Sequence, residues 1–298
     1  MTTTTVAASA PGKVILFGEH AVVHSQPAIA ASLDDLRIYS VIRHDEVSSS
    51  GMLTVNMPNF KKGLIFRAHT ASCLYENNID KDVAKGVVSP SSDEIQSIQK
   101  SIKQASLNPE LKEDEVEALT PLFFLMIGII PALLNSKSSL SIYVRSEDLP
   151  LGAGLGSSAA FCVASSAALY RLREKTAHIT GISGAGRNDT KDDNTRPERD
   201  VLDIINAWSF ASEGVIHGNP SGLDNTVSCY GGAVYYQKDA ETGKMRAFNE
   251  LVVPPLDMIL TNTFIPRSTK KLVAGVQTVK EDFEFTVDVF AAIGRISE

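Results

Sequence analysis

The chain has 298 residues, of which 43% are hydrophobic and 21% are charged, and its formal net charge is −7. This composition predicts a globular protein with a large core, while the acidic balance argues against general binding of nucleic acid, which usually requires a basic face. The longest apolar stretch, 119–134, is shorter than a membrane span and contains prolines, so we interpret it as a buried helix.

Two features of the sequence favour the cytoplasm. The first ten residues lack both the basic segment and the apolar segment of a signal peptide. Cys73, Cys162 and Cys229 follow no metal-binding spacing and form no even-numbered set, as is usual in a reducing compartment. We therefore expect a cytoplasmic protein without a membrane partner.

Taken in chain order, the sequence predicts a mixture of strands and helices without regular alternation, which is an α+β pattern. Short or alternating apolar runs predict strands, and longer apolar or amphipathic stretches predict helices. The predicted strands are 13–17, 38–43, 140–144, 233–237 and 256–261, and the predicted helices are 91–105, 113–134, 159–172 and 200–217. In the last helix, Ile204, Trp208 and Val215 are expected to face the core. The polar run at 180–199 has the composition most typical of disorder.

A glycine-rich stretch lies between the predicted strand at 140–144 and the predicted helix at 159–172. Its sequence, residues 151–160, is Leu-Gly-Ala-Gly-Leu-Gly-Ser-Ser-Ala-Ala. At such a turn, free backbone N–H groups and the positive end of the helix dipole both favour a phosphate. Ser157 and Ser158 could cap the helix or reach a metal ion bound to that phosphate. The alternative is a tight turn in which glycine and serine serve only as connector and cap.

Two familiar phosphate-binding loops do not fit this stretch. No Gly-Lys-Ser/Thr sequence closes it, which excludes a Walker A loop. A dinucleotide-binding loop would follow the first strand of a βαβ unit and precede an acidic residue by about 20 positions. Here the following helix runs into a polar loop, so another kind of phosphate loop is expected.

Two further motifs accompany the glycine-rich stretch. Residues 10–24 read Ala-Pro-Gly-Lys-Val-Ile-Leu-Phe-Gly-Glu-His-Ala-Val-Val-His, and residues 213–225 read Glu-Gly-Val-Ile-His-Gly-Asn-Pro-Ser-Gly-Leu-Asp-Asn. Together the three motifs resemble the GHMP small-molecule kinases, and their wording is similar to that of the mevalonate kinases within this superfamily. The resemblance continues through 260–269 and so covers nearly the whole chain.

The resemblance implies a two-domain α+β GHMP kinase fold with the active site in the cleft between the domains. Residues 1–250 would form the N-terminal domain that carries the nucleotide loop, and residues 251–298 would begin an incomplete C-terminal domain. The implied reaction is ATP-dependent phosphorylation of the primary hydroxyl of (R)-mevalonate to 5-phosphomevalonate, toward isoprenoids and sterols. The implied partners are ATP, mevalonate and Mg2+, and a homodimer is also an expectation.

The resemblance also assigns roles to particular residues. Asp224 would be the catalytic base that accepts the hydroxyl proton, and Lys13 would neutralise charge beside it as the phosphoryl group moves. Ser158 and Glu213 would ligate Mg2+. The implied ATP-binding residues are Lys13, Asn59, Ser146, Gly152, Ala153, Gly154, Leu155, Gly156, Ser157 and Ser158. The implied substrate-binding residues are Glu19, His20, Arg267 and Thr269.

Several of these residues also have plainer interpretations. Glu213 lies on a predicted helix, where a lone glutamate usually faces solvent. Asp224 follows Asn-Pro-Ser-Gly-Leu, and an aspartate beside such residues is often a turn or cap residue. His24 and His217 are interpreted as structural residues.

Two departures from the family pattern affect these expectations. Ser25 stands where the family usually has glycine, which is expected to restrict the local backbone. The family's third, glycine-rich motif does not occur in this sequence, which suggests a truncated form with little mevalonate-dependent activity. Val252, Leu256, Ile259 and Phe264 would then be abnormally exposed. The alternatives are another GHMP kinase, or a nucleotide-binding or partner-binding variant without catalysis.

Overall fold

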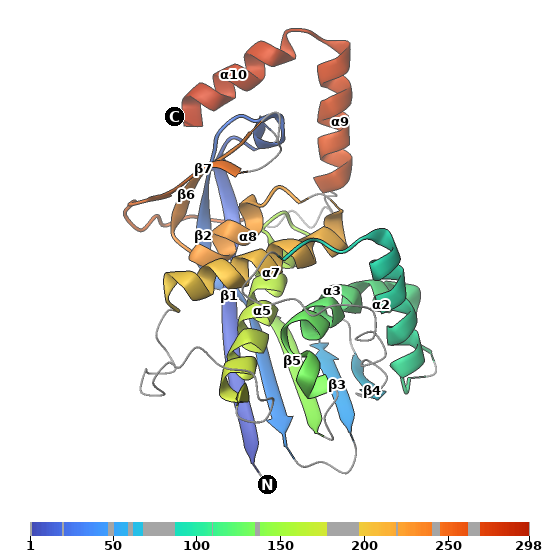
Figure 1. The fold of residues 1–298 in the computed structure, drawn as a ribbon. Helices are drawn as coiled ribbons and strands as arrows, with labels where there is room; N and C mark the ends of the chain where they lie inside the picture. Colours follow the sequence, from blue (N-terminus) through green and yellow to red (C-terminus); the bar gives the residue numbers. More distant parts are fainter. Residues whose placement is uncertain are drawn as a thin grey trace.

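The computed structural model of the chain describes most of its residues (Figure 1). The residues outside this description are 1, 20, 47–50, 59–61, 68–86, 109, 135–137, 178–196, 219, 240–244, 262–268 and 298. Most of the polar run at 180–199 is among them, so the expectation of disorder there lies outside the described residues.

One mixed sheet forms the centre of the fold. Its strands are β1 (Thr3–Phe17), β2 (Ala28–Asp45), β3 (Met52–Met57), β4 (Lys62–Arg67), β5 (Ser139–Glu147), β6 (Ala233–Lys238) and β7 (Met245–Leu251). The order is β4-β3-β5-β2-β6-β7, with β1 also paired to β2. Within the described residues, β3 and β5 are parallel and the other paired strands are antiparallel. The long strand β2 therefore joins β1, β5 and β6 into a single sheet.

Helices pack on one face of this sheet, and α9 and α10 lie beyond its end (Figure 1). The helices are η1 (Ala21–His24, a 3-10 turn), α2 (Ser92–Ala105), α3 (Glu113–Ile129), α4 (Pro131–Leu134), α5 (Ser157–Lys175), α7 (Arg199–His217), α8 (Leu223–Tyr230), α9 (Thr269–Asp282) and α10 (Thr286–Ser297). Figure 1 shows α3 and α5 against the sheet, with α2 beside α3, and α7 packs on α3 and α5. Along β5, Leu140, Ile142 and Val144 are buried while the residues between them are exposed, as expected for a strand covered on one face.

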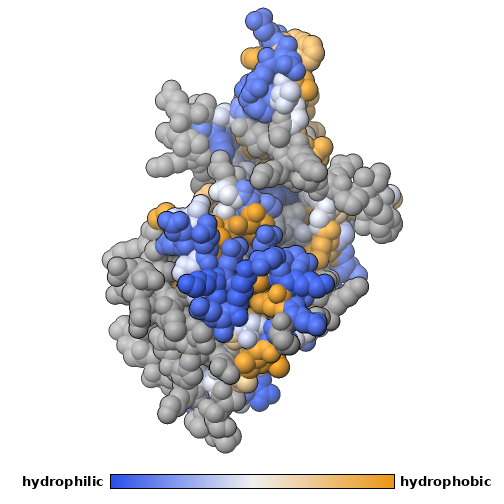
Figure 2. Space-filling model, turned by 90° about the vertical axis from the view of Figure 1, so that its right-hand side faces the viewer, coloured by the Kyte–Doolittle hydropathy of each residue, from blue (hydrophilic) through white to orange (hydrophobic). Residues whose placement is uncertain are grey.

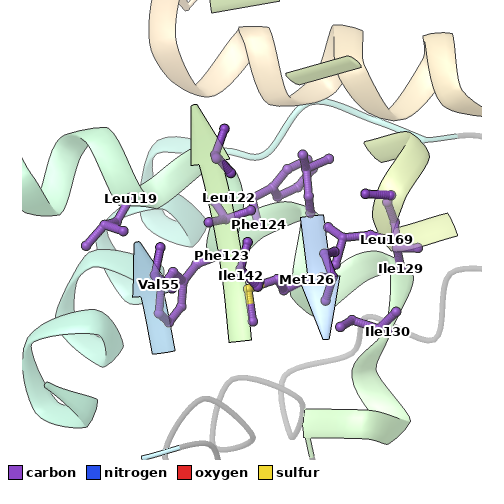
Figure 3. Packing of buried hydrophobic residues seen from close by; sticks show 14 of the residues in the cluster. Val55, Leu119, Leu122, Phe123, Phe124, Met126, Ile129, Ile130, Ile142 and Leu169 are labelled. Carbon is purple, nitrogen blue, oxygen red and sulfur yellow. The ribbon is translucent and has the colours of Figure 1, made fainter. Parts of the chain in front are cut away.

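The main core lies between the sheet and these helices. α3 is buried on nearly all sides because its sequence is apolar without a polar stripe. Phe123 of α3 packs edge-on against Phe66 of β4, with ring centroids 5.2 Å apart. Figure 3 shows Phe123 and Met126 of α3 in one cluster with Val55 of β3 and Ile142 of β5. This packing fixes the sheet and the helices that carry the site.

The surface on the α2 side of the molecule is polar. Figure 2 views the molecule from the side where α2 lies in Figure 1, and it shows mostly hydrophilic residues with scattered hydrophobic ones. α2 begins with a capping box: Ser91 Oγ accepts from the Glu94 N–H, and the Glu94 carboxylate accepts from the Ser91 N–H. The helix buries Ile98 and Ile102 and turns its charged residues to solvent.

Most of the predicted elements are confirmed. The helices predicted at 91–105, 113–134, 159–172 and 200–217 occur as α2, α3 with α4, α5 and α7, and the strands predicted at 13–17, 38–43, 140–144 and 233–237 occur within β1, β2, β5 and β6. The apolar stretch 119–134 is buried. Trp208 of α7 lies in the core, and the partly buried side chains of Ile204 and Val215 pack against the same core. Among the described residues, no helix is long and apolar enough to cross a membrane.

The strand predicted at 256–261 is wrong, because this segment has no regular secondary structure. A short apolar run becomes a strand only where a neighbouring strand completes its hydrogen bonds, and no described strand pairs with it. Val252 and Ile259 are almost fully exposed and Leu256 is half exposed. The expected exposure is therefore confirmed for these three residues, while Phe264 lies outside the described residues.

The end of η1 and Ser25, which follows it, are held from two sides. His24 stacks on Phe290 of α10, with ring centroids 4.5 Å apart, and Lys280 Nζ of α9 lies 3.4 Å from His24 Nδ1. Gln237 Nε2 of β6 donates to the carbonyl of Ser25 at 3.1 Å. Ser25 has a φ of 67°, a left-handed conformation that is costly for a residue with a Cβ, so the expected restriction at this position is confirmed.

The division of the chain into a domain of residues 1–250 and an incomplete domain of residues 251–298 stays a prediction.

His44 is an ionisable side chain inside the core. It lies on β2, is fully buried, and neither ring nitrogen has a hydrogen-bond partner among the described residues. Burial lowers the pKa of His44 below its usual value, although the nearby carboxylates of Glu46 and Asp45 act in the opposite direction. The folded protein therefore keeps this imidazole neutral at a pH where the unfolded chain protonates it.

We expect the free energy of unfolding to decrease as the pH falls below about 6.5, because the unfolded chain then binds a proton that folded His44 does not. A His44→Leu variant should lose this part of the pH dependence, which amounts to at most about 1.4 kcal/mol per pH unit. The free energies of unfolding of the wild type and the variant are first measured by urea unfolding at about pH 8, where His44 is neutral in both the folded and the unfolded chain. Equal losses of stability in both proteins on moving to about pH 5.5 would contradict the expectation.

Candidate active site

The connection from β5 to α5 is the glycine loop, and its predicted place between a strand and a helix is confirmed. Gly152, Gly154 and Gly156 have φ values of 72°, 81° and 70°. Gly156 is the N-cap of α5, so the hypothesis that Ser157 or Ser158 caps this helix is wrong. The free N–H groups at the start of this 19-residue helix, together with its dipole, form a site suited to an anion.

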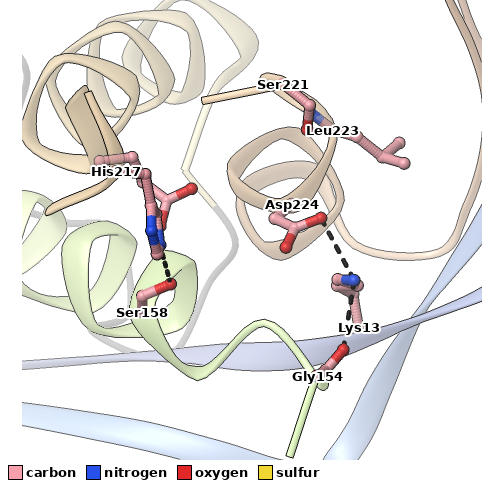
Figure 4. A network of polar contacts seen from close by, with 8 residues as sticks. Lys13, Gly154, Ser158, His217, Ser221, Leu223 and Asp224 are labelled. Carbon is pink, nitrogen blue, oxygen red and sulfur yellow. Dashed lines mark hydrogen bonds and ion pairs between the residues drawn. The ribbon is translucent and has the colours of Figure 1, made fainter. Parts of the chain in front are cut away.

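Lys13 ties the first strand to this loop. Its backbone N–H donates to Leu155 O at 2.9 Å, and its Nζ donates to Gly154 O at 3.3 Å (Figure 4). Its side chain also lies against Gly156, where an added Cβ would come within 2.8 Å of Lys13 Cγ. Glycine is therefore required at position 156 both by the left-handed backbone and by the packing of Lys13.

The ammonium group of Lys13 forms an ion pair with Asp224. Nζ lies 3.3 Å from Oδ1, and the Lys13 side chain is buried while 30% of the Asp224 side chain is exposed. Asp224 lies in the first turn of α8, which Ser228 fixes to the backbone of β1 by a 2.7 Å hydrogen bond. Asn225 fixes the same helix to Asn206 of α7, also at 2.7 Å. A carboxylate held in this way, beside a buried cation and open to solvent, can receive a substrate hydroxyl.

Glu213, Ser158 and His217 form a second polar group beside the loop. Glu213 is 3% exposed, which overturns the solvent-facing interpretation of this residue. His217 Nε2 lies 3.1 Å from Ser158 Oγ (Figure 4). The same nitrogen lies 3.8 Å from Glu213 Oε1. Burial raises the pKa of Glu213 to about 7; Asp224 adds to this shift, and Ser158 and Lys13 oppose it. Burial lowers the pKa of His217, and the negative charge of Asp224 opposes that shift.

The Glu213 carboxylate fits a divalent cation. Its Oε1 is buried and has no hydrogen-bond partner among the described residues, an arrangement that is costly unless a cation faces the oxygen. The hydroxyl of Ser158 supplies a second hard oxygen. Mg2+ commonly takes one or two protein oxygens and completes its coordination with water and phosphate. Within the described ranges, no group of three His, Cys, Asp or Glu residues is placed to hold a metal ion.

A cavity of about 620 Å3 opens beside the start of α5. Its walls come from α2, α3, α5 and α7 and from β2, β3 and β5. Apolar side chains line it together with polar and acidic ones, which include Gln99, Asp114, Glu117, Ser146, Ser157 and Ser158. A cavity of this size can enclose a small organic ligand. Because Ser157 and Ser158 belong to both the cavity and the start of α5, such a ligand could extend from the cavity to the glycine loop.

The structure brings many of the predicted site residues together. Those that meet here are Lys13, Ser146, Gly152, Ala153, Gly154, Leu155, Gly156, Ser157, Ser158, Glu213 and Asp224. Of the others, His20, Asn59 and Arg267 lie outside the described residues, Thr269 begins α9 with a side chain that is not described, and Glu19 is exposed in the turn after β1.

His217 is the residue of this group that the motifs do not assign to the site. Its position in the sequence contains a usable signal, because it follows Glu213 by four residues on one helix, and residues at that spacing share a helix face. The contact between His217 and Ser158 could not be predicted from spacing in the sequence, because it depends on how α5 and α7 pack against each other.

Comparison with known proteins identifies the family. A family model described as the GHMP kinases N terminal domain matches residues 125–186, which include the glycine loop. The curated mevalonate kinase of Mus musculus is 38% identical over 298 residues, and that of Homo sapiens is 36% identical over 290 residues. Each alignment covers 97% of this chain and 67% of the relative, so the chain spans about two thirds of the length of these relatives.

Solved structures share the fold. The crystal structure of L. major mevalonate kinase in complex with R-mevalonate has a TM-score of 0.57 at 22% identity, covering 99% of this chain and 67% of that chain. The Methanococcus jannaschii mevalonate kinase has a TM-score of 0.57 at 18% identity, covering 98% of this chain and 71% of that chain. The predicted α+β GHMP kinase fold is therefore confirmed. From its similarity to the curated relatives over almost all of its length, the chain belongs to the mevalonate kinase family of the GHMP kinases.

Proposed function

We propose that the chain transfers the γ-phosphoryl group of ATP to the primary hydroxyl of (R)-mevalonate, giving ADP and 5-phosphomevalonate. The observation that carries this proposal is the Lys13–Asp224 ion pair, held against a glycine loop at the start of a helix. Phosphoryl transfer requires a phosphate cradle, neutralisation of charge and an acceptor for the hydroxyl proton. The site offers a candidate for each of these.

ATP would occupy the cavity and the glycine loop together. The 620 Å3 cavity suits the nucleoside, and its lining serines continue into the start of α5. The phosphates would then meet the N–H groups at the positive end of this helix. Asn59 and Ser146 are proposed for the nucleotide side, Ser146 because it lines the cavity and Asn59 on the family resemblance alone.

Ser158 and Glu213 would hold Mg2+, for which Glu213 provides a buried, unpartnered carboxylate oxygen. When bound there, Mg2+ supplies neutralisation of the negative charge on the β and γ phosphate oxygens. Glu213 and Ser158 come from α7 and α5, so the packing of these two helices sets the distance between the two ligands.

In the proposed reaction, the hydroxyl oxygen forms a bond to the γ-phosphorus, and the bond from that phosphorus to the bridging oxygen of ADP breaks. The hydroxyl proton passes to the Asp224 carboxylate. Lys13 lies 3.3 Å from that carboxylate and is placed to neutralise charge on the moving phosphoryl group. Because an ionised aspartate is a weak base, orientation of the hydroxyl and charge neutralisation contribute more than proton abstraction.

The substrate side rests on the family resemblance. Glu19, His20 and Thr269 are proposed to contact mevalonate, and Arg267 to neutralise its carboxylate. The product would enter isoprenoid and sterol synthesis in the cytoplasm, and a homodimer is proposed as the working assembly. Of these residues, only Glu19 has a described side chain, and it is exposed near the end of β1.

A panel assay tests the proposed function. The purified chain is incubated with ATP, Mg2+ and one of mevalonate, phosphomevalonate, galactose or homoserine, and ADP is measured. Whatever the overall rate, mevalonate should give more ADP than the other three compounds, with phosphate found on its primary hydroxyl. Turnover of a different alcohol would indicate another GHMP kinase, and nucleotide binding without ADP formation would indicate a variant without catalysis.

A Glu213→Gln variant is expected to need more Mg2+ for half-maximal activity, because a charged oxygen ligand is replaced by a weaker neutral one. A Ser158→Ala variant should show a smaller increase. Initial rates over a series of Mg2+ concentrations at saturating ATP measure both effects. Glu113→Gln is the control, since it only breaks an exposed ion pair with Lys103. An unchanged Mg2+ requirement in Glu213→Gln would return this residue to a structural role.

A further inference from the structure

His217 contacts both of the residues proposed to bind the metal ion. It is the last residue of α7, one helical turn after Glu213. Its Nε2 lies 3.1 Å from Ser158 Oγ, within hydrogen-bond distance, and 3.8 Å from Glu213 Oε1, beyond it. Figure 4 shows the imidazole pointing from α7 toward the serine at the start of α5.

The position of the Ser158 proton decides whether this hydroxyl can act as a metal ligand. A serine hydroxyl has one proton and two lone pairs, and only a lone pair can face a cation. The proton therefore needs an acceptor that is not the metal-binding carboxylate. On α7, both His217 Nε2 and the Glu213 carboxylate are within reach of this proton, and of the two only His217 is not proposed as a metal ligand.

We propose that His217 is a positioning residue that accepts a hydrogen bond from the Ser158 hydroxyl at Nε2 and so turns the lone pairs of Ser158 Oγ toward the metal ion. The inference rests on the proposed function and deepens it. It requires the tautomer of His217 that carries its proton on Nδ1 and leaves Nε2 as an acceptor. Ser158 also hydrogen-bonds the Glu213 carboxylate, so His217 competes with this carboxylate for the Ser158 proton, and a cation bound to Glu213 would leave that proton to His217.

A purely structural role would have a different basis. A histidine at the end of a helix can interact with the last carbonyls and with the negative end of the helix dipole. Its removal would then lower stability without changing metal affinity. The His217 side chain is 48% exposed, so loss of core packing would contribute little to either effect.

Two substitutions separate these roles. His217→Gln places an amide oxygen near the position of Nε2 and keeps an acceptor for Ser158, whereas the shorter side chain of His217→Asn ends near the position of Nδ1 and does not. Affinity for Mn2+ in the presence of ADP, measured from the electron paramagnetic resonance signal of free Mn2+, requires no turnover and no mevalonate. Loss of a residue that orients a metal ligand typically weakens metal affinity by about 10- to 100-fold.

We expect His217→Asn to weaken Mn2+ binding by about 10-fold or more and His217→Gln to stay within about 3-fold of the wild type. In a Ser158→Ala background, His217→Asn should have no further effect, because the hydroxyl it orients is gone. Melting temperatures of both variants and their ADP affinity in EDTA serve as controls for folding and for the phosphate site.

Wild-type Mn2+ affinity in His217→Asn, or an equal loss in the Ser158→Ala background, would overturn the inference. These results do not depend on the substrate. If the wild-type protein bound Mn2+ and ADP as expected but failed to phosphorylate mevalonate, the proposed function would fail while the role of His217 stood.

Discussion

An Asp224→Asn variant is expected to lose between about 10² and 10⁴ in kcat while its affinity for ATP changes by no more than a few-fold. The two side chains have nearly the same shape, but asparagine removes both the proton acceptor and the negative charge 3.3 Å from Lys13 Nζ. ATP should still bind, since the glycine loop and the cavity contain no part of Asp224. Initial rates with mevalonate, together with equilibrium binding of a fluorescent ATP analogue, measure the two quantities.

Asp203→Asn is the matched control. This carboxylate lies on α7 and accepts a hydrogen bond from Tyr230 of α8, the helix that carries Asp224, but it has no described contact with Lys13. Its loss should leave kcat within a few-fold of the wild type. If Asp224→Asn retained turnover at a similar level, Asp224 would only anchor α8 to β1 through Lys13 and would not be a catalytic residue.

A Gly156→Ala variant is expected to lower kcat/KM for ATP by about 10²-fold, as displacements of about 1 Å near the reacting groups can do. The new Cβ would meet Lys13 Cγ at 2.8 Å, in a backbone with a φ of 70°. The Lys13 side chain would have to move, and with it the ammonium group that contacts Asp224. Steady-state kinetics over a series of ATP concentrations gives this ratio.

Gly152→Ala separates backbone strain from displacement of the lysine. Gly152 has a φ of 72° in the same loop, but an added Cβ there meets nothing within 4 Å. Both variants therefore carry similar strain, about 1 to 2 kcal/mol, and only Gly156→Ala disturbs Lys13. Equal losses in the two variants would show that loop strain alone is responsible.

Local parts of the structure could be predicted from the sequence. The glycine loop was predicted between a strand and a helix because the signals for all three are local. Alternating apolar residues indicate the strand, glycines indicate the loop, and small and apolar residues indicate the helix. The apolar stretch 119–134 was predicted to be buried for the same reason. The strand predicted at 256–261 is wrong because strand formation depends on a partner elsewhere in the chain.

The site itself required more than local patterns. Lys13 and Asp224 were paired only through the family resemblance, since no spacing rule connects residues on β1 and α8. The burial of Glu213 depends on how α7 packs against α3 and α5, which periodicity does not specify. His217 was left outside the site for the same reason, although its spacing from Glu213 is visible in the sequence.

The contacts of Lys13 with the glycine loop connect distant parts of the chain. Gly154 lies 141 positions from Lys13, and Ser228, which fixes α8 to β1, lies 217 positions from its acceptor Pro11. Closing such long loops costs entropy that only a formed core offsets. Bound nucleotide should therefore stabilise only the folded state, by about 2.7 kcal/mol at 100 times its Kd. A rise in melting temperature on adding ADP would thus report on the folding of the whole sheet rather than on the loop alone.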